Sequence, residues 1–346
     1  MEDKKYTRRE FLKRTAAVGG AAVVGSTFSF GILSAKNPKI TLTFSTMFPT
    51  SYFWTPVAQK WVKYVEEKSN GEVKFNFFHS GQLFKAKAEL PALQRGEIDV
   101  SIPNANYQSG TIPGSDVGAL PFLLRDEDDA WHVIQAGLWD IGLKQKWEKK
   151  GIEILAECPG GMYQFGNLRH EIKGPDDVKG LIWAVSSKAH AKAIEVLGGS
   201  PTFMSSGRLY TAFQRKTIDG CLRPYLTYTG RKLYEVMKYL TVANVGNYTI
   251  LLSFNKKRFD SLPKDIQSLL RSSAQKWAEW SFEGVKQTKR DALKIFKENG
   301  MKVHVLDDTA FNEFKKRLTS VYKWWVAQVP DGQKYIDFIE SHHLKR

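Results

Sequence analysis

The sequence predicts an α/β fold, in which short apolar strands alternate with amphipathic helices. Two observations in the first third of the chain favour it. Residues 40–45, 73–77 and 96–102 have the composition and length of strands, and residues 56–68 and 87–95 have helical spacing between them. Strands and helices that alternate in this order form a parallel sheet with helices on both of its faces.

The same alternation recurs in residues 174–224, which contain the most informative part of the chain. Residues 181–185 form an apolar run of the length of a buried strand, and residues 188–197 have helical spacing and end at two glycines. In open α/β sheets, ligands bind beyond the carboxyl ends of the strands. Half of a binding site is therefore expected at residues 184–187, 204–206 and 221–223.

Length and composition indicate a globular protein of about two domains. The chain has 346 residues, of which 42% are hydrophobic and 25% are charged, with a net charge of +15. The basic residues are interspersed with acidic ones and no nucleic-acid-binding motif is present, so no nucleic-acid partner is expected. The charge then reflects either a basic solvated surface or a means of attracting an anionic solute or lipid.

The N-terminus has the pattern of an export signal. Residues 7–13 read TRREFLK, the order of a twin-arginine signal, and residues 16–33 form a mildly apolar segment rich in Ala, Gly and Val. We expect residues 1–35 to be a signal peptide that the twin-arginine export machinery reads, and the mature protein to work in the periplasm. A retained membrane anchor is the alternative.

Motifs of the common enzyme classes are missing from the sequence. It contains no G-x-S-x-G, Walker A, G-x-G-x-x-G or H-E-x-x-H pattern, so we expect a protein that is not an enzyme and needs no cofactor or metal. A hydrolase that uses Ser186 or Ser206 with His190 is an alternative without a motif. The two cysteines, Cys158 and Cys221, form either a disulfide or two free buried thiols.

Three segments carry a resemblance to a known family. They read GPDDVKGLIWAVS at 174–186, LGGSPTFMSSGRLYTAFQRKTIDGCLRP at 197–224 and KLYEVMKYLT at 232–241. In order and spacing they resemble the core of the DctP-type extracytoplasmic solute-binding proteins of TRAP transporters. The likeness extends over nearly the whole chain from about residue 39, and includes LPFLLRD at 120–126.

This resemblance implies a two-lobed periplasmic-binding-protein fold. Each lobe is a mixed, mostly parallel sheet flanked by helices, and one long helix, from Pro263 to about Asn299, spans both lobes. Lobe I would comprise residues 36–158 and 246–285, and lobe II residues 159–245 and 286–346. The chain would cross between the lobes near residues 156–159 and 243–247.

The resemblance also implies a transport function. A small organic acid, by default a carboxylate, would bind in the cleft between the lobes, and the closed receptor would deliver it to the TRAP membrane subunits. A binding protein of an ATP-driven importer is one alternative. A TRAP receptor for another ligand, such as an aromatic acid, a sulfonate or a zwitterion, is a second.

One departure from the family pattern gives a hypothesis about the site. The family holds its carboxylate with an Arg, and the matching position here is Ala184. We hypothesise that Arg223 replaces this Arg across the same cleft; a structural bridge or a solvent-facing side chain is the alternative. The other candidate ligand-binding residues are Phe48, Asn104, Tyr107, Gln164, Trp183, Ser206 and Tyr248, and Trp183 could instead be a core residue.

Overall fold

The computed structural model describes residues 39–345, and it confirms the predicted α/β class. The predicted signal peptide, residues 1–35, lies outside the described residues. Ten strands join in one mixed sheet, in which the pairs are partly parallel and partly antiparallel. The strands are β1 (Ile40–Ser45), β2 (Val73–Phe78), β3 (Val100–Ser101), β4 (Ile152–Asn167), β5 (Ile182–Val185), β6 (Ser200–Phe203), β7 (Gly220–Pro224), β8 (Tyr239–Val242), β9 (Asn247–Asn255) and β10 (Lys302–Val305).

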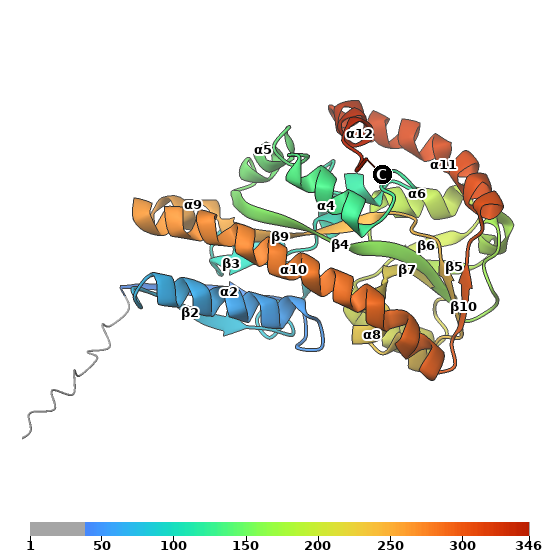
Figure 1. The fold of residues 1–346 in the computed structure, drawn as a ribbon, viewed down its shortest axis with the longest axis horizontal. Helices are drawn as coiled ribbons and strands as arrows, with labels where there is room; N and C mark the ends of the chain where they lie inside the picture. Colours follow the sequence, from blue (N-terminus) through green and yellow to red (C-terminus); the bar gives the residue numbers. More distant parts are fainter. Residues whose placement is uncertain (1–38, 346) are drawn as a thin grey trace, which may run out of the picture. The chain divides into compact units, whose positions relative to one another are not determined.

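Helices flank the sheet, as the alternating sequence pattern predicts (Figure 1). None of the helices in residues 39–345 combines the length and apolar character that crossing a bilayer requires. The helices are α2 (Trp54–Lys68), α3 (Ala86–Arg95), α4 (Glu127–Gln135), α5 (Leu143–Glu148), α6 (Lys188–Val196), α7 (Leu209–Gln214), α8 (Tyr225–Gly230), α9 (Lys256–Asp260), α10 (Lys264–Glu298), α11 (Asp308–Gln328) and α12 (Gly332–Ser341).

The strands fall into two groups that share β4. In the first group, β1 pairs in parallel with β2 and β3, and β9 runs antiparallel to both β3 and β4. In the second group, β5 pairs in parallel with β6 and β7, and β4 runs antiparallel to β7 and β8. The carboxyl ends of β1 and β3, and those of β5, β6 and β7, therefore each lie at one edge of a parallel group.

The two groups are joined by one continuous strand, β4, which includes residues 156–159, where the resemblance places a crossing between lobes. β4 pairs with β9 as far as Met162, and from Tyr163 it pairs with β7. The register with β9 shifts between Pro159 and Met162, where Gly161 adopts a φ of 110° that favours glycine. One strand thus passes from the first group to the second through a bulge.

The long helix α10 confirms the prediction of a helix from Pro263 to about Asn299. It packs against β4, against α2 beside the first group and against α8 beside the second (Figure 1). Its buried face repeats at helical spacing, with Ile266, Leu270, Trp277 and Phe282 directed inward. Burial of such side chains stabilises the helix by about 1.5–3 kcal/mol each, so this apolar stripe holds α10 in place.

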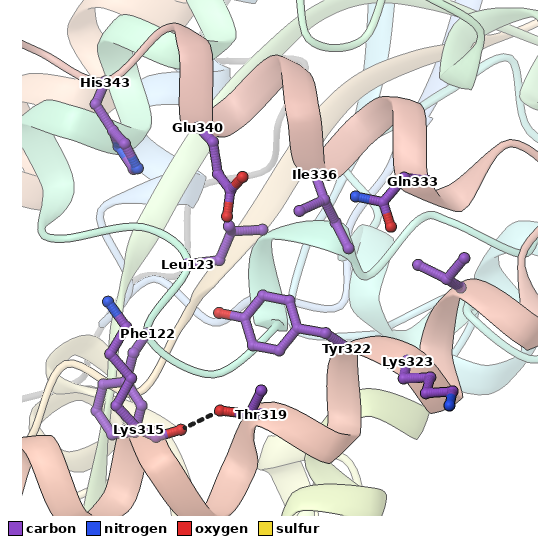
Figure 2. A pocket seen from close by; sticks show the side chains of 11 residues that line it. Phe122, Leu123, Lys315, Thr319, Tyr322, Lys323, Gln333, Ile336, Glu340 and His343 are labelled. Atoms are coloured by element: carbon purple, nitrogen blue, oxygen red, sulfur yellow. Dashed lines mark hydrogen bonds between the residues drawn. The ribbon is translucent and has the colours of Figure 1, made fainter.

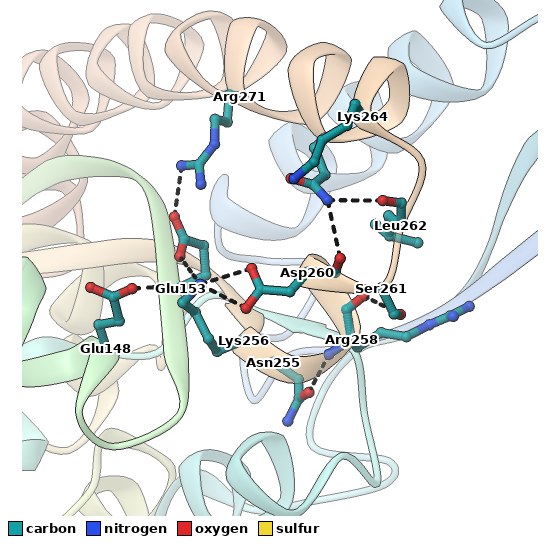
Figure 3. A network of polar contacts seen from close by, with 11 residues as sticks. Glu148, Glu153, Asn255, Lys256, Arg258, Asp260, Ser261, Leu262, Lys264 and Arg271 are labelled. Carbon is teal, nitrogen blue, oxygen red and sulfur yellow. Dashed lines mark hydrogen bonds and ion pairs between the residues drawn. The ribbon is translucent and has the colours of Figure 1, made fainter.

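Ion pairs at the start of α10 add little to that packing (Figure 3). Lys256 on α9 contacts Asp260 at 2.8 Å, Glu148 at 3.5 Å and Glu153 at 3.7 Å. Arg271 on α10 reaches the same Glu153 at 2.6 Å. Glu153 is mostly buried, but its basic partners are partly exposed, and ion pairs near the surface contribute about 0–1 kcal/mol each, so the network adds little to the apolar packing of α10.

The C-terminal helices are partly predictable. Apolar residues at helical spacing, among them Phe314, Leu318, Val321 and Trp325, indicate α11 from the sequence alone, whereas α12 has no counterpart in the sequence analysis. α12 packs on α11 through Tyr335, Ile336 and Ile339. It is only ten residues long and directly follows Pro330, a residue typical of turns.

A buried acidic residue lies beneath the loops at the edge of the first group. Glu89 on α3 is 1% exposed, and its Oε1 has no hydrogen-bond partner within the described chain. Ser45, Ser101 and Ser253, which face one another across β1, β3 and β9, also have buried hydroxyl groups without partners. Burial raises the pKa of Glu89 to about 8, because the charged carboxylate is poorly solvated there.

This pKa makes stability depend on pH. Between pH 4.5 and about 8 the folded protein keeps a proton on Glu89 that the unfolded chain releases, so the free energy of unfolding falls as pH rises through this window. We predict that Glu89→Gln, which resembles the protonated side chain, flattens this fall and is more stable than the wild type at pH 8. Urea unfolding at pH 5 and pH 8 measures it. Glu67→Gln, at an exposed position on α2, is the control, and an equal pH slope in Glu89→Gln and the wild type would contradict the assignment.

Candidate ligand-binding site

A narrow cavity lies where the loops of the two strand groups meet, and we call it the inner cavity. Its volume is only about 10 Å³, which leaves room for about one water molecule. It contains six of the eight predicted site residues. Its lining consists of Phe48, Tyr52, Asn104, Tyr107, Tyr163, Ser206, Arg223, Pro224, Thr227 and Tyr248.

Arg223 is the only charged side chain in this lining, and it is 2% exposed. Its Nη1 donates to the carbonyl oxygens of Leu222 at 2.6 Å and Ala184 at 3.2 Å. Its Nη2 donates to those of Met204 at 2.6 Å and Val185 at 3.3 Å. Arg223 thus lies against Ala184, the position at which the family pattern has its Arg. The Nε–H group has no partner in the described residues.

The charge of Arg223 is not neutralised by the protein around it. No ion pair joins its guanidinium to an Asp or Glu within residues 39–345, and the four carbonyl groups that surround it are neutral. A buried charge without a counter-ion is strongly destabilising, by several kcal/mol. An anion in the inner cavity would supply the missing counter-charge, and the unpaired Nε–H group would be a donor for it.

Neighbouring groups experience this charge. Burial, and after it the positive charge of Arg223, lowers the pKa of His190 to about 3. Burial raises the pKa of the Cys221 thiol to about 11, and Arg223 acts against that shift. His190 is therefore neutral at physiological pH, and it does not add a second cation beside the cavity.

Tyr163 lines the cavity, although it is not among the ligand-binding residues expected from the sequence. Its hydroxyl group forms a hydrogen bond of 2.8 Å with Ser186 Oγ and accepts one from Asn106 Nδ2 at 3.4 Å. The His190 ring packs edge-on against it at 4.2 Å between ring centroids. The hydroxyl group is thereby oriented at the cavity beside Arg223.

Gln164, a predicted site residue, does not line the cavity. Successive side chains on a strand point to opposite faces, so Tyr163 and Gln164 on β4 cannot both face the ligand. The Gln164 amide oxygen instead accepts from the backbone N–H of Ala243 at 2.7 Å and of Asn244 at 3.0 Å. These hydrogen bonds hold the segment between β8 and β9 against β4.

Trp183, another candidate, is a core residue in this structure. It is fully buried, and its Nε1 donates to the Val178 carbonyl at 3.2 Å. Its ring packs edge-on against Phe165 at 5.4 Å. The alternation of β5 turns Trp183 to the face opposite Ala184, which was the alternative left open for this residue.

The loops after β1 and β3 contribute the other half of the lining. The Phe48 ring stacks on Tyr52 at 5.6 Å. Asn104 caps a short 3₁₀-helix (Ala105–Gln108) through Oδ1, which accepts from the Asn106 amide at 3.0 Å. Its side-chain amide nitrogen has no partner among residues 39–345 and is a possible ligand donor.

One contact joins the two halves directly across the cavity. The Ser206 backbone N–H donates to the Tyr107 hydroxyl oxygen at 3.1 Å, from the second strand group to the first. Because this contact closes the cavity on one side, a ligand larger than a water molecule requires the two halves to move apart.

The remaining lining residues had little sequence signal. Tyr52 lies in the aromatic-rich loop that follows the first strand. Because it is close to Phe48 in the chain, it could have been expected as a ligand-binding residue. Pro224 and Thr227 lie at the join of β7 and α8, where the family resemblance offered no site residue. Of the two alternatives for the cysteines, a disulfide or two free buried thiols, the structure shows the second.

A larger cavity beside α11 is a weaker candidate for the ligand-binding site. It has a volume of about 510 Å³ and lies between α11, α12 and the segment around Phe122 (Figure 2). Two of the polar groups there are already paired: Tyr322 donates to the Pro121 carbonyl at 2.6 Å, and His343 contacts Asp129 at 2.8 Å. Size alone favours this cavity, but the unpaired buried charge favours the inner one.

The chemistry of a hydrolase is not assembled in the described residues. Ser186 Oγ lies 3.5 Å from His190 Nδ1, a long hydrogen bond, and His190 Nε2 has no partner that could orient the ring. With a pKa of about 3, His190 is also a weak base at neutral pH. Ser206 has no contact with His190 in this structure.

Comparison with known proteins identifies the family. Residues 44–328 match the family described as "Bacterial extracellular solute-binding protein, family 7", or DctP. The chain belongs to this family. Its members are substrate-binding receptors, and the fold of this solute-binding protein is that of the receptors of TRAP transporters.

Named relatives and solved structures agree with that assignment. The protein is 29% identical over 286 residues to the 2,3-diketo-L-gulonate-binding periplasmic protein YiaO of Escherichia coli, covering 82% of this chain and 86% of the relative. It is 29% identical over 245 residues to the C4-dicarboxylate-binding periplasmic protein DctP of Rhodobacter capsulatus, covering 70% and 73%. A TRAP solute-binding protein of Desulfovibrio salexigens with bound orotic acid superposes with a TM-score of 0.82 at 25% identity, covering 87% and 98%.

Tyr248 of this solute-binding protein depends on a glycine for its place. The Tyr248 ring lies directly on Gly160 of β4, where the Cβ of any other residue would overlap the ring atoms. Its hydroxyl group accepts from Trp54 Nε1 at 3.2 Å, so the ring is fixed between the bulge of β4 and α2.

We predict that Gly160→Ala lowers the free energy of unfolding by about 1–3 kcal/mol, because the ring must move out of its position. Urea denaturation followed by tryptophan fluorescence measures the change. Gly110→Ala, whose new Cβ would meet its nearest neighbour at 3.8 Å, is the matched control and should change stability little. Equal urea midpoints for the two variants would contradict this account of Tyr248.

Proposed function

We propose that this protein is the periplasmic receptor of a TRAP transporter, which captures a small organic acid in the inner cavity and delivers it to the membrane subunits. The single observation that carries the proposal is the buried guanidinium of Arg223, which lacks a counter-ion in the described chain. A carboxylate is the simplest ligand with the charge and hydrogen-bond acceptors for this position.

The ligands of related proteins support the proposed class. YiaO binds 2,3-diketo-L-gulonate, and DctP of Rhodobacter capsulatus binds C4-dicarboxylates. The Desulfovibrio structure holds orotic acid, an aromatic carboxylate. An aromatic acid is a second candidate here, because five aromatic side chains line the inner cavity. They are Phe48, Tyr52, Tyr107, Tyr163 and Tyr248.

For the mechanism we propose hinge closure between two lobes, residues 36–158 with 246–285 and residues 159–245 with 286–346. The strands β4 and β9 and the helix α10 would be the hinge elements, since β4 pairs in both groups, α10 packs beside both, and β9 follows β8 along the chain. Closure brings the loops after β1 and β3 toward Arg223 and removes water from around it. In this drier site, hydrogen bonds to the acid are stronger, and no bond of the solute is made or broken.

The route to the membrane completes the proposal. The TRREFLK motif supports export through the twin-arginine machinery, which would deliver a folded receptor to the periplasm. The acid-loaded, closed form would then dock on the TRAP membrane subunits, while the empty, open form would not.

The test of this proposal begins with ligand discovery. Purified protein is screened by thermal shift against small acids, including succinate, glucuronate, 2,3-diketogulonate and orotate. A ligand at 100 times its Kd stabilises the protein by about 2.7 kcal/mol, which is readily measured.

For the best acid we predict that Arg223→Gln weakens binding about 100-fold, since one partner of a buried charge pair is removed. Arg223→Lys keeps the charge and should lose less. Arg215→Gln, at an exposed position after α7, is the control and should bind as the wild type does. Isothermal titration measures each Kd, with circular dichroism to check folding. An unchanged Kd in a folded Arg223→Gln protein would overturn the proposal.

A further inference from the structure

A second cavity adjoins the inner one, and we call it the outer cavity. It has a volume of about 510 Å³, which is enough for part of a small solute. Met47 and the start of α3 form one side of it, and the segment of residues 205–208 forms the other. Ser206 lines both cavities, so the two adjoin at this residue.

The outer cavity is lined by positive charge alone. Lys85, Lys87, Arg208 and Arg231 lie in its wall, and no Asp or Glu does. None of these four side chains forms an ion pair with a carboxylate within residues 39–345. Other basic residues of the described surface commonly have such partners, for example Lys74 with Glu66 at 2.9 Å and Arg317 with Asp176 at 2.7 Å.

Arg231 connects the outer cavity to the inner one. It is half-buried at the end of α8, and its Nε atom is buried without a hydrogen-bond partner in the described chain. Its guanidinium lies over the Tyr52 ring, with 5.1 Å from Cζ to the ring centroid. Tyr52 itself lines the inner cavity. A rigid aromatic ring thus fixes Arg231 beside the space that leads to Arg223.

We propose that the outer cavity binds a second acidic group of the same ligand, so that the preferred solute is a small dianion. One acidic group would pair with Arg223, and the other would pair with Arg231 in the field of Lys85 and Arg208. This inference depends on the proposed function. It adds that a monoanion would leave Arg231 unpaired, whereas a dicarboxylate, or a carboxylate that also carries a sulfonate or phosphate group, would pair with both guanidinium groups.

The test compares acids that differ in one charge. The α,ω-dicarboxylates from succinate to adipate are titrated beside their monoamides, which have nearly the same shape and one fewer negative charge. We expect at least one dicarboxylate to bind the wild type about tenfold or more tightly than its monoamide, since a charged group strengthens a hydrogen bond. In Arg231→Gln this preference should fall to near one, while the affinity for the monoamide stays nearly unchanged.

Two further variants make the result specific. Arg231→Lys retains the charge and should keep part of the preference for the dicarboxylate. Arg215→Gln removes an exposed cation away from both cavities and should keep all of it. Thermal unfolding of each variant shows that it is folded, and raising the salt concentration should reduce the preference in the wild type, because the outer cavity is partly open to solvent.

The outcomes separate the two proposals. If dicarboxylates and monoamides bind the wild type equally, or if Arg231→Gln weakens both to the same extent, the second subsite is wrong and the acid receptor proposal stands. If Arg231→Gln leaves the preference intact, the subsite is likewise wrong. If no acid binds the wild type in the thermal-shift screen or in titration, both proposals are wrong.

Discussion

The guanidinium group of Arg223 is held in the protein interior by four backbone carbonyl groups, and one N–H group is left over. The carbonyl dipoles fix its position and stabilise the cation, but they leave its full positive charge in place. In an interior of low dielectric constant this charge attracts an anion much more strongly than it would in water. On the proposed function, the site would therefore select its ligand by charge first and by shape second.

The fold explains why four carbonyl groups converge on one side chain. Ala184 and Val185 end β5, Met204 follows β6, and Leu222 lies on β7. Because these three strands are parallel, their carboxyl ends meet at one edge of the sheet. The loops after β1 and β3 meet this edge from the other strand group, and β4, β9 and α10 connect the two.

Much of this arrangement could be predicted from the sequence, and the misses have a physical reason. The alternation of strands and helices predicts the fold class, the family resemblance implies the long helix, and the missing Arg at position 184 points to Arg223. Gln164 and Trp183 were chosen by their place in the chain, which does not tell which face of a strand a residue occupies. For the same reason the sequence does not tell that Tyr163, rather than its neighbour Gln164, lines the cavity. The bulge that carries β4 past Pro159 requires knowledge of its pairing with β9, which is not a local property of the chain.

The central claim is that an acidic group of the ligand pairs with the buried charge of Arg223, and the unpartnered Nε–H group reports on it directly. Its resonance can be followed in a ¹H–¹⁵N NMR spectrum of arginine side chains and assigned by its disappearance in Arg223→Lys. We predict that saturation with the bound acid shifts this resonance and slows the exchange of its proton with water. A resonance that stays unchanged while the acid is bound would contradict the account.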